Sequence, residues 1–425
     1  MLVAVPVVGL FFPQRESLGL DPRESTPGFK RQIIILNSET RSLKRTAIVM
    51  DRVIGLKVST NTIERISLEA GNDLEAAEQS QWQSVLTGEV LAPQVAIVEF
   101  DGGRIRTRQT DCGPGVHLVG KGWNETKNAI FVSASSETSA SDPDAESPAC
   151  FLDRAHVAKL SEKAKIREKP GENEDFTDQS EELASAEAAI IESKHKPKRI
   201  LRTVLSSMKN SSEFGHQMKR EAARRKFDSA PRKAFVADGL TCNWTIQQMH
   251  FKDYVPILDF THAVSYLFTA SLICLGKGEK AWEQYCDWMT AAWRGNVGRV
   301  LMELRGHQQQ LGLPPEDAAE DDHREQLRRV IGYLENSRRR MKYDQYRCQG
   351  LPTTSAWMES AVKEVNYRVK GTEMFWNNPA GAEAILQIRS AGLSEDDRLV
   401  RFLTCRPGHD RLRRTAAPQA NHQAA

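Results

Sequence analysis

The chain has 425 residues and a formal net charge of +2, with 40% hydrophobic and 27% charged residues. This length allows two or three domains with buried cores and excludes a disulfide-stabilised mini-protein. The longest apolar stretch, Val264 to Leu275, is about half of the roughly 20 residues that a membrane span needs, so we expect a buried helix there and no membrane partner.

The N-terminal residues give no targeting signal. Met1 to Phe12 is apolar but has no Lys or Arg ahead of its apolar run and no small-residue cleavage site, so no signal peptide is predicted. The seven cysteines stand singly, without a CxxC pair, which favours free thiols over a zinc site or a disulfide framework. We therefore expect a cytoplasmic protein.

Residues 1–88 are predicted to form a helical region with a helix-turn-helix at about 42–70. Ser42 to Val53 has apolar residues near helical spacing, Gly55 stands at a break, and Ser59 or Thr60 can cap a second helix. A short helix, a glycine-containing turn and a capped second helix are typical of the DNA-binding motif. An ordinary helical hairpin would produce the same pattern.

Residues 89–274 are predicted to be the first part of an α/β core. Gln94 to Phe100 is a β-branched and apolar run, and Asp101 with two glycines predicts a hairpin turn before the alternating residues 104–108. A third strand is expected at Asn128 to Val132, after a glycine-rich loop at 113–122.

The charge is segregated in the middle of the chain. Residues 135–192 contain 15 acidic and 6 basic side chains, whereas residues 194–233 contain 13 basic and 3 acidic ones. The segment at about 133–192 also lacks apolar periodicity at its start, so we expect a disordered acidic insertion. The basic block indicates nucleic-acid binding, although a helix face exposed to solvent could have the same composition.

The following elements alternate between helix and strand. Helical character is expected at 184–226, a strand at 233–238, a helix at 244–251, a strand at 254–259 and a long helix from His262. The predicted order is three strands, helix, strand, helix, strand, helix, which is an α/β fold.

The last third of the chain is predicted to be mostly helical. Residues 275–342 are expected to form an all-α insertion with breaks at Gly295, Gly306 and Pro314, and Trp282, Trp288 and Trp293 as core anchors. Residues 343–408 would complete the core with a helix that Thr354 or Ser355 caps and that runs to about 370. Residues 409–425 are expected to be a disordered tail.

Three acidic residues stand at positions typical of metal sites. Asp101 and Asp238 follow strands, and Glu359 lies in the first turn of the late helix. Hard oxygen ligands suit Mg²⁺ or Mn²⁺, and paired ions of this kind serve phosphoryl transfer in nucleases and polymerases. Taken singly, each acid could simply form a turn or cap a helix. Asp259, with His262, is an alternative second carboxylate.

The late helix has one apolar face and one polar face. Glu359, Lys363, Asn366 and Lys370 fall at i, i+4, i+7 and i+11, so the polar face could hold a metal and contact phosphates. A Glu-Lys surface pair is the simpler interpretation of Glu359 and Lys363.

These residues resemble the DDE transposases of bacterial insertion sequences, of the ISKra type. The segment 351–376, LPTTSAWMESAVKEVNYRVKGTEMFW, is similar to the family's glutamate helix, and residues 382–389 continue it. Shorter matches are DGGR at 101–104, WNETK at 123–127, VADG at 236–239 and ILDFTH at 257–262. Together these matches span about 17–408.

The resemblance implies an RNase H-like mixed sheet with flanking helices, an N-terminal helix-turn-helix and an all-α insertion before the last catalytic helix. It implies that Asp101, Asp238 and Glu359 hold two Mg²⁺ or Mn²⁺ ions for DNA cleavage and strand transfer. The partner would be double-stranded DNA, both transposon ends and target, bound by a homodimer or higher multimer associated with the bacterial nucleoid. The DNA-binding residues that this interpretation indicates are Thr60, Asn61, Arg65, Lys363, Asn366, Arg368 and Lys370.

The chain differs from the family at its start, since residues 1–12 look unlike the longer, often cysteine-containing N-termini of relatives. We therefore keep two alternatives open: an RNase H-like nuclease that cuts without joining, and a truncated, non-catalytic DNA-binding relic.

Overall fold

The computed structural model describes residues 25–80, 91–107, 123–168, 194–370 and 376–405. The chain divides into two compact units, and each is described separately below. One unit comprises Glu89–Ala382, and the other combines Met1–Gly88 with Glu383–Ala425.

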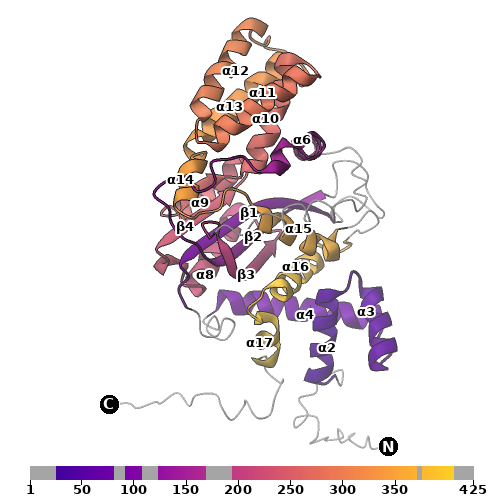
Figure 1. Cartoon of the computed structure of the whole chain (residues 1–425). Helices are drawn as coiled ribbons and strands as arrows, with labels where there is room; N and C mark the ends of the chain where they lie inside the picture. Colours follow the sequence, from indigo (N-terminus) through magenta and orange to yellow (C-terminus); the bar gives the residue numbers. More distant parts are fainter. Residues whose placement is uncertain (1–24, 81–90, 108–122, 169–193, 371–375, 406–425) are drawn as a thin grey trace, which may run out of the picture. The chain divides into compact units, whose positions relative to one another are not determined.

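The larger unit is built on a five-stranded mixed sheet (Figure 1). Its strands are β1 (Val95–Arg106), β2 (Trp123–Ser135), β3 (Lys198–Ser207), β4 (Arg232–Ala237) and β5 (Val255–Leu258). In space they follow the order β3-β2-β1-β4-β5. The pairs β1-β2 and β2-β3 are antiparallel, whereas β1-β4 and β4-β5 are parallel. The predicted α/β class is confirmed, and this topology is compatible with an RNase H-like fold.

The strands differ from the prediction in two places. The hairpin predicted at Asp101 is wrong, because β1 continues through Asp101 and both glycines to Arg106 and pairs with β2 along its whole length. The segment around Lys198 to Ser207, predicted to be helical, is instead the edge strand β3. The expected order of three strands before the first helix is also wrong, because α6 (Arg154–Glu168) lies between β2 and β3 in the chain. The predicted loop at 113–122 lies outside the described residues.

Helices cover both faces of the sheet. The helices of this unit are α6 (Arg154–Glu168), α8 (Ser211–Arg224), α9 (Thr241–His250), α10 (Phe260–Leu275), α11 (Glu279–Trp293), α12 (Val297–Leu311), α13 (His323–Ser337), α14 (Tyr343–Cys348) and α15 (Ala356–Val369). Successive side chains of a strand alternate between the two faces. Phe100 on β1 packs on Phe214 of α8, with 5.9 Å between ring centroids. The next residue toward the N-terminus, Glu99, faces the other way and contacts α15.

The predicted helices after β5 are present. Figure 1 shows α10, α11, α12 and α13 packed side by side, as the extensive contacts between them require. Trp288 and Trp293, predicted as core anchors, are 0% and 3% exposed. Gly295 ends a helix in the left-handed conformation, as expected, but α12 runs through Gly306 without a break.

The segment predicted as a disordered acidic insertion is ordered wherever the structure describes it. Residues 133–135 belong to β2, residues 149–152 form a 3-10 turn, and α6 follows. Between them, Asp142 accepts two hydrogen bonds from the Arg347 guanidinium. Trp293 donates its indole N–H to the Asp144 carbonyl at 2.9 Å. These partners lie about 150 to 200 residues away, which is why the local sequence does not reveal them. Residues 169–192 lie outside the described part.

The smaller unit is helical. Its helices are α2 (Pro27–Glu39), α3 (Leu43–Val49), α4 (Thr60–Gln79), α16 (Pro379–Leu393, whose first residues belong to the larger unit) and α17 (Arg398–Cys405), with a π-helical turn η1 (Met50–Ile54) after α3. Gly55, at φ +75°, ends the turn, and Ser59 caps α4 by accepting from the Thr62 N–H at 3.1 Å. The break predicted at Gly55 and the cap predicted at Ser59 are thus confirmed.

The C-terminal helices share a core with the N-terminal ones. The described residues 383–405, which we expected in the last part of the catalytic core at 343–408, belong to this unit. Its core consists of Ile33, Ile34, Met50, Ile63, Ile66, Ala70, Leu74, Ala77, Ile388, Ala391, Leu399, Phe402 and Leu403. Gly71 allows close packing, since an added Cβ would lie 2.4 Å from the Ala384 carbonyl oxygen. Among the described helices of either unit, none combines the length and the apolar character required to cross a membrane.

Candidate active site

Asp101 and Asp238 are neighbours at the point where the parallel pairing of β1 and β4 ends. The last residue pair between β1 and β4 is Phe100 beside Ala237. Asp101 and Asp238 are the residues that follow this pair in the sequence. Adjacent strands lie roughly 5 Å apart, and residues in register point to the same face. Asp101 is 9% exposed. The two acids therefore end on the same face of the sheet.

The carboxylate of Asp238 is held through one of its two oxygens. Oδ1 accepts a hydrogen bond from the Leu240 N–H at 2.9 Å and another from Asn243 Nδ2 at 2.5 Å. Oδ2 accepts no hydrogen bond from the residues that the structure describes. This arrangement fixes the side chain and leaves one oxygen available to a ligand.

Asp259 is engaged through both oxygens. Its Oδ1 accepts from the Thr261 N–H at 3.0 Å and caps α10, and its Oδ2 accepts from the Ser355 hydroxyl at 2.6 Å. The side chain is 1% exposed, and His262 Nε2 lies 3.9 Å from Oδ2. Asp259 thus connects α10 to the start of α15, and this structural role makes it the weaker candidate for a metal ligand.

A buried acid on β1 positions the helix that carries Glu359. The Glu99 side chain is 0% exposed, and its Oε2 accepts from the backbone N–H of Met358 at 2.8 Å. This N–H belongs to the first turn of α15 and also donates to the Ser355 carbonyl at 2.9 Å. Glu99 is two residues before Asp101 and so on the same face, which brings the first turn of α15 to the part of β1 that carries Asp101. Sequence reasoning missed Glu99, although a single acid inside an apolar run requires a buried partner.

Glu359 lies in this first turn, next to Met358. Its side chain is half-buried, and its carboxylate makes no hydrogen bond or ion pair with another described residue. Within the described ranges, no three His, Cys, Asp or Glu side chains are close enough to hold a metal ion together. The structure therefore brings Asp101, Asp238 and Glu359 to one end of one face but does not gather them into a single coordination sphere.

The rest of α15 agrees in part with the prediction. Met358, Ala361, Val365 and Val369 are buried at 1–2% exposure, as expected for the apolar face. Lys363, Asn366 and Lys370 are half-buried on the other side, and Lys370 Nζ lies 5.7 Å from the centre of the Trp123 ring.

Arg368 does not fit the predicted DNA-binding role. It is 1% exposed and its guanidinium lies over the Trp376 ring, 5.6 Å from its centre. Arg368 is therefore a packing residue in this structure. The amphipathic pattern of α15 did not reveal this, because the contact is made by Trp376, which lies outside the helix.

The N-terminal candidates lie at the start of α4, in the other unit. Thr60 and Asn61 are exposed in the first turn. Arg65, one turn further, is half-buried and lies 3.7 Å from the Glu69 carboxylate. Exposed polar residues in the first turn of a helix are accessible to a large ligand.

A tyrosine from the helical bundle packs against the turn that follows Asp238. A Cβ added to Gly239 would lie 2.0 Å from Tyr333 Cε2 and 2.8 Å from its hydroxyl oxygen. The Tyr333 ring, on α13, stacks on Tyr266 of α10 with 3.7 Å between centroids and 16° between planes. Its hydroxyl is buried, and burial, with the nearby Tyr266 and Asp238, raises the pKa of Tyr333 well above its usual value.

An ion pair between a buried lysine and an exposed glutamate lies near the turn that follows β4. Lys127 on β2 is 4% exposed, and its Nζ lies 3.0 Å from Glu125 Oε2. Burial raises the pKa of the Cys242 thiol, and the negative charges of Glu125 and Asp238 raise it further. The WNETK segment is therefore part of β2 and lies close to the turn after β4.

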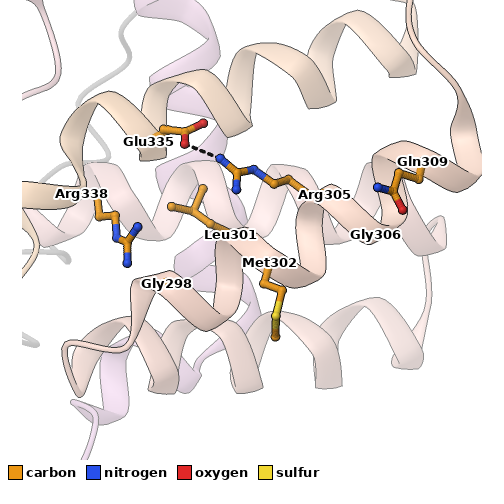
Figure 2. Close-up of a pocket in the computed structure, with 8 residues that line it drawn as sticks. All are labelled: Gly298, Leu301, Met302, Arg305, Gly306, Gln309, Glu335 and Arg338. Carbon is orange, nitrogen blue, oxygen red and sulfur yellow. Dashed lines mark hydrogen bonds and ion pairs between the residues drawn. The ribbon is translucent and has the colours of Figure 1, made fainter.

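A hollow between α12 and α13 lies apart from these acids. It has a volume of about 360 Å³ and is lined by Gly298, Leu301, Met302, Arg305, Gly306, Gln309, Glu335 and Arg338 (Figure 2). Figure 2 shows Arg305 paired with Glu335 across the hollow. None of the predicted site residues lines it, and it contains a single carboxylate that is already paired, so we do not regard it as the active site. Comparison with protein-family models and with curated proteins gave no match to this chain.

Proposed function

We propose that the chain is a DNA transposase of the DDE type, similar to those of bacterial insertion sequences, which cleaves and joins DNA with Mg²⁺ or Mn²⁺. One observation carries the proposal: Asp101 and Asp238 directly follow the last pair of the parallel strands β1 and β4, on the face that the first turn of α15, with Glu359, crosses. The strand order β3-β2-β1-β4-β5 supports an RNase H-like core. The similarity of segment 351–376 to the family's glutamate helix supports the same assignment.

The donor atoms fit a hard divalent cation, because all three candidate ligands are carboxylates. Asp238 would use Oδ2, the oxygen that its hydrogen bonds leave available. Asn243 holds Asp238 in place, and Glu99 sets the position of α15 and so of Glu359. Such a cation stabilises the negative charge that develops on phosphate oxygens during displacement. No serine or tyrosine nucleophile is assigned.

The remaining elements are proposed to bind DNA. Lys363 and Asn366 on α15 could contact the phosphates that flank the cleaved bond, since phosphate contacts set the register of a duplex. The helices around 42–70 would act as a helix-turn-helix on transposon ends, with Thr60 and Asn61 at the exposed start of α4. Helices α11 to α13 would be the insertion that precedes the catalytic helix α15. DNA-bound chains would form dimers or higher multimers.

The test is an assay of nicking and strand transfer on labelled DNA that carries the inverted repeats flanking the gene, with Mg²⁺ or Mn²⁺. The variants are Asp101→Asn, Asp238→Asn, Glu359→Gln and Asp259→Asn. Asp253→Asn is the matched control, because Asp253 is 51% exposed and pairs with Lys233 at the opposite end of β5.

We expect both reactions to fall by more than about 100-fold in the first three variants, since preorganised charge stabilisation of this size is typical of catalytic groups. The control variant should retain full activity. Loss in Asp259→Asn with activity retained in Asp238→Asn would assign the second ligand to Asp259 instead. Nicking without joining would favour the nuclease, and DNA binding without either reaction in the wild type would favour the non-catalytic relic.

A further inference from the structure

We propose that Tyr333 is a positioning residue for Asp238, through which helix α13 sets the orientation of that carboxylate and its affinity for a divalent cation. This inference rests on the proposed function, because it takes Asp238 to be a cation ligand. Tyr333 lies almost a hundred residues after Asp238 in the chain and on a helix of the bundle, so no local pattern links the two.

The first observation is steric. The Tyr333 ring occupies the space that a side chain at position 239 would need, since an added Cβ would lie 2.0 Å from Cε2 and 2.6 Å from Cζ. Glycine at 239 thus allows the ring to contact the backbone directly after Asp238. The ring is also held by Tyr266, on which it stacks at 3.7 Å between centroids.

The second observation is an unused hydrogen-bond donor. The Tyr333 hydroxyl is buried and has no hydrogen-bond partner among the described residues. A buried hydroxyl that makes no hydrogen bond is unfavourable, and native structures retain few of them. The hydroxyl oxygen lies 2.8 Å from the Cβ position of Gly239, so it stands beside the turn that carries Asp238.

The third observation is the acceptor capacity of Asp238. Its Oδ1 already accepts from Leu240 and Asn243, whereas Oδ2 accepts nothing from the described residues. A carboxylate oxygen has two lone pairs, so Oδ2 can bind a cation and still accept one hydrogen bond. The Tyr333 hydroxyl is the nearby buried donor that lacks a partner. In the cation-bound protein it would donate to Oδ2 and fix the direction in which that oxygen faces the cation.

The same contacts connect two helices of the bundle to the turn after β4. Tyr333 reaches the Asp238 turn from α13, and its stacking partner Tyr266 comes from α10. A displacement of α13 relative to α10 would move the ring against Gly239. A shift of the bundle would thus change the orientation of the Asp238 carboxylate through the Tyr333 side chain.

The experiment measures the affinity of the full-length chain for Mn²⁺ without DNA, by titration with electron paramagnetic resonance detection of free Mn²⁺. The variants are Tyr333→Phe, which removes only the hydroxyl, and Asp238→Asn, which tests the ligand itself. Tyr254→Phe is the matched control, since the Tyr254 hydroxyl is also buried without a partner among the described residues but precedes β5, at the other end of the parallel strands.

We expect Tyr333→Phe to weaken Mn²⁺ binding about 10-fold, because groups that orient metal ligands typically contribute 10- to 100-fold to affinity. Tyr254→Phe should bind like the wild type, and both phenylalanine variants should melt at or above the wild-type temperature, because each removes a buried hydroxyl that has no partner among the described residues. In the cleavage assay, Tyr333→Phe should need about 10-fold more Mn²⁺ for half-maximal rate and reach the wild-type rate at saturation.

A second pair of variants keeps the inference testable if Tyr333→Phe does not fold. Gly239→Ala should weaken Mn²⁺ binding in the wild type, but the same change should have little further effect in a Tyr333→Val background, where the ring is absent. Wild-type affinity in Tyr333→Phe, with affinity lost in Asp238→Asn, would overturn the role of Tyr333 alone. Unchanged affinity in Asp238→Asn would overturn the metal assignment of the proposed function and this inference with it.

Discussion

The ion pair between Asp142 and Arg347 is predicted to be a main anchor of the acidic segment. Arg347 is 5% exposed and donates to both Asp142 oxygens and, at 3.0 Å, to the Trp293 carbonyl. Its guanidinium also lies 4.1 Å from the centre of the Trp293 ring. Replacing Asp142 by Asn would leave this buried cation without its counter-charge.

Breaking a buried pair from one side typically costs about 3–5 kcal/mol of unfolding free energy. Since the Asp142 side chain is 18% exposed, we expect the lower end of this range, about 3 kcal/mol for Asp142→Asn. In a unit of this size that loss lowers the melting temperature by roughly 5 °C. Differential scanning calorimetry at pH 7 measures it. Asp144→Asn is the control, because Asp144 pairs only distantly with Lys196, at 4.0 Å, near the surface.

The difference between wild type and Asp142→Asn should depend on pH. Burial alone would raise the pKa of Asp142, but hydrogen bonds from Arg347 and the Asp144 backbone outweigh it and hold the pKa below its usual value. The folded state thus favours the ionised carboxylate, and this stabilisation is complete above the usual Asp pKa of about 4. It is lost as the pH falls through the lowered pKa. Equal melting temperatures for Asp142→Asn, Asp144→Asn and wild type at pH 7 would refute the reasoning.

Three further changes have defined outcomes. Gly350→Ala should lower the urea midpoint, by at least about 1 kcal/mol in unfolding free energy, because Gly350 has φ +62° and a Cβ there would lie 2.7 Å from the Glu137 carbonyl oxygen; an unchanged midpoint would contradict this. Asp259→Ala should cost about 1–2 kcal/mol through loss of the α10 cap, also measured in urea, and inactivity without that cost would indicate a ligand instead. Burial, with the charge of His216, lowers the pKa of His250, so the folded state favours neutral imidazole. Wild type should therefore lose melting temperature relative to His250→Gln as the pH falls below about 6.5, and parallel curves would contradict this.

Part of the fold could be predicted because its signals are local. The runs before Asp238 and Asp259 are short, apolar and followed by an acid, and both became the parallel strands β4 and β5. The helix capped near Ser355 was also predicted within a few residues of α15. These elements depend on neighbouring residues in the chain, which a single sequence reveals.

Other elements depend on partners far away in the sequence. The glycines after Asp101 suggested a turn, yet Gly103 continues β1 and pairs with Thr126 on β2. Glycine fits there because the Thr126 and Asn128 side chains lie 2.6 and 3.0 Å from the position that a Cβ would take. The strand β3 was missed because inward-facing Arg202 and Thr203 interrupt its apolar pattern.

Those two polar residues are satisfied by helices on opposite faces of the sheet. Arg202 donates to Glu364 at 2.9 Å and Thr203 donates to Glu221 at 2.6 Å. Of the candidate site, the acids themselves could be predicted from the sequence. Two residues beside these acids could not be predicted. Glu99 bonds to Met358, which is 259 residues away in the sequence. Tyr333 reaches the turn after Asp238 from α13, which is also distant in the sequence.

The hydrogen bond from Met358 to Glu99 also determines when the candidate site can form during synthesis. The two residues are 259 positions apart, and ribosomes add about 5–20 residues per second, so roughly 10–50 s pass between their appearance. During that time the nascent chain already contains Asp101 and Asp238 but has no α15 to cross them. Glu99, buried in the finished protein, would remain hydrated until the helix arrives. The face that carries Asp101, Asp238 and Glu359 is thus completed only after α15 has been made.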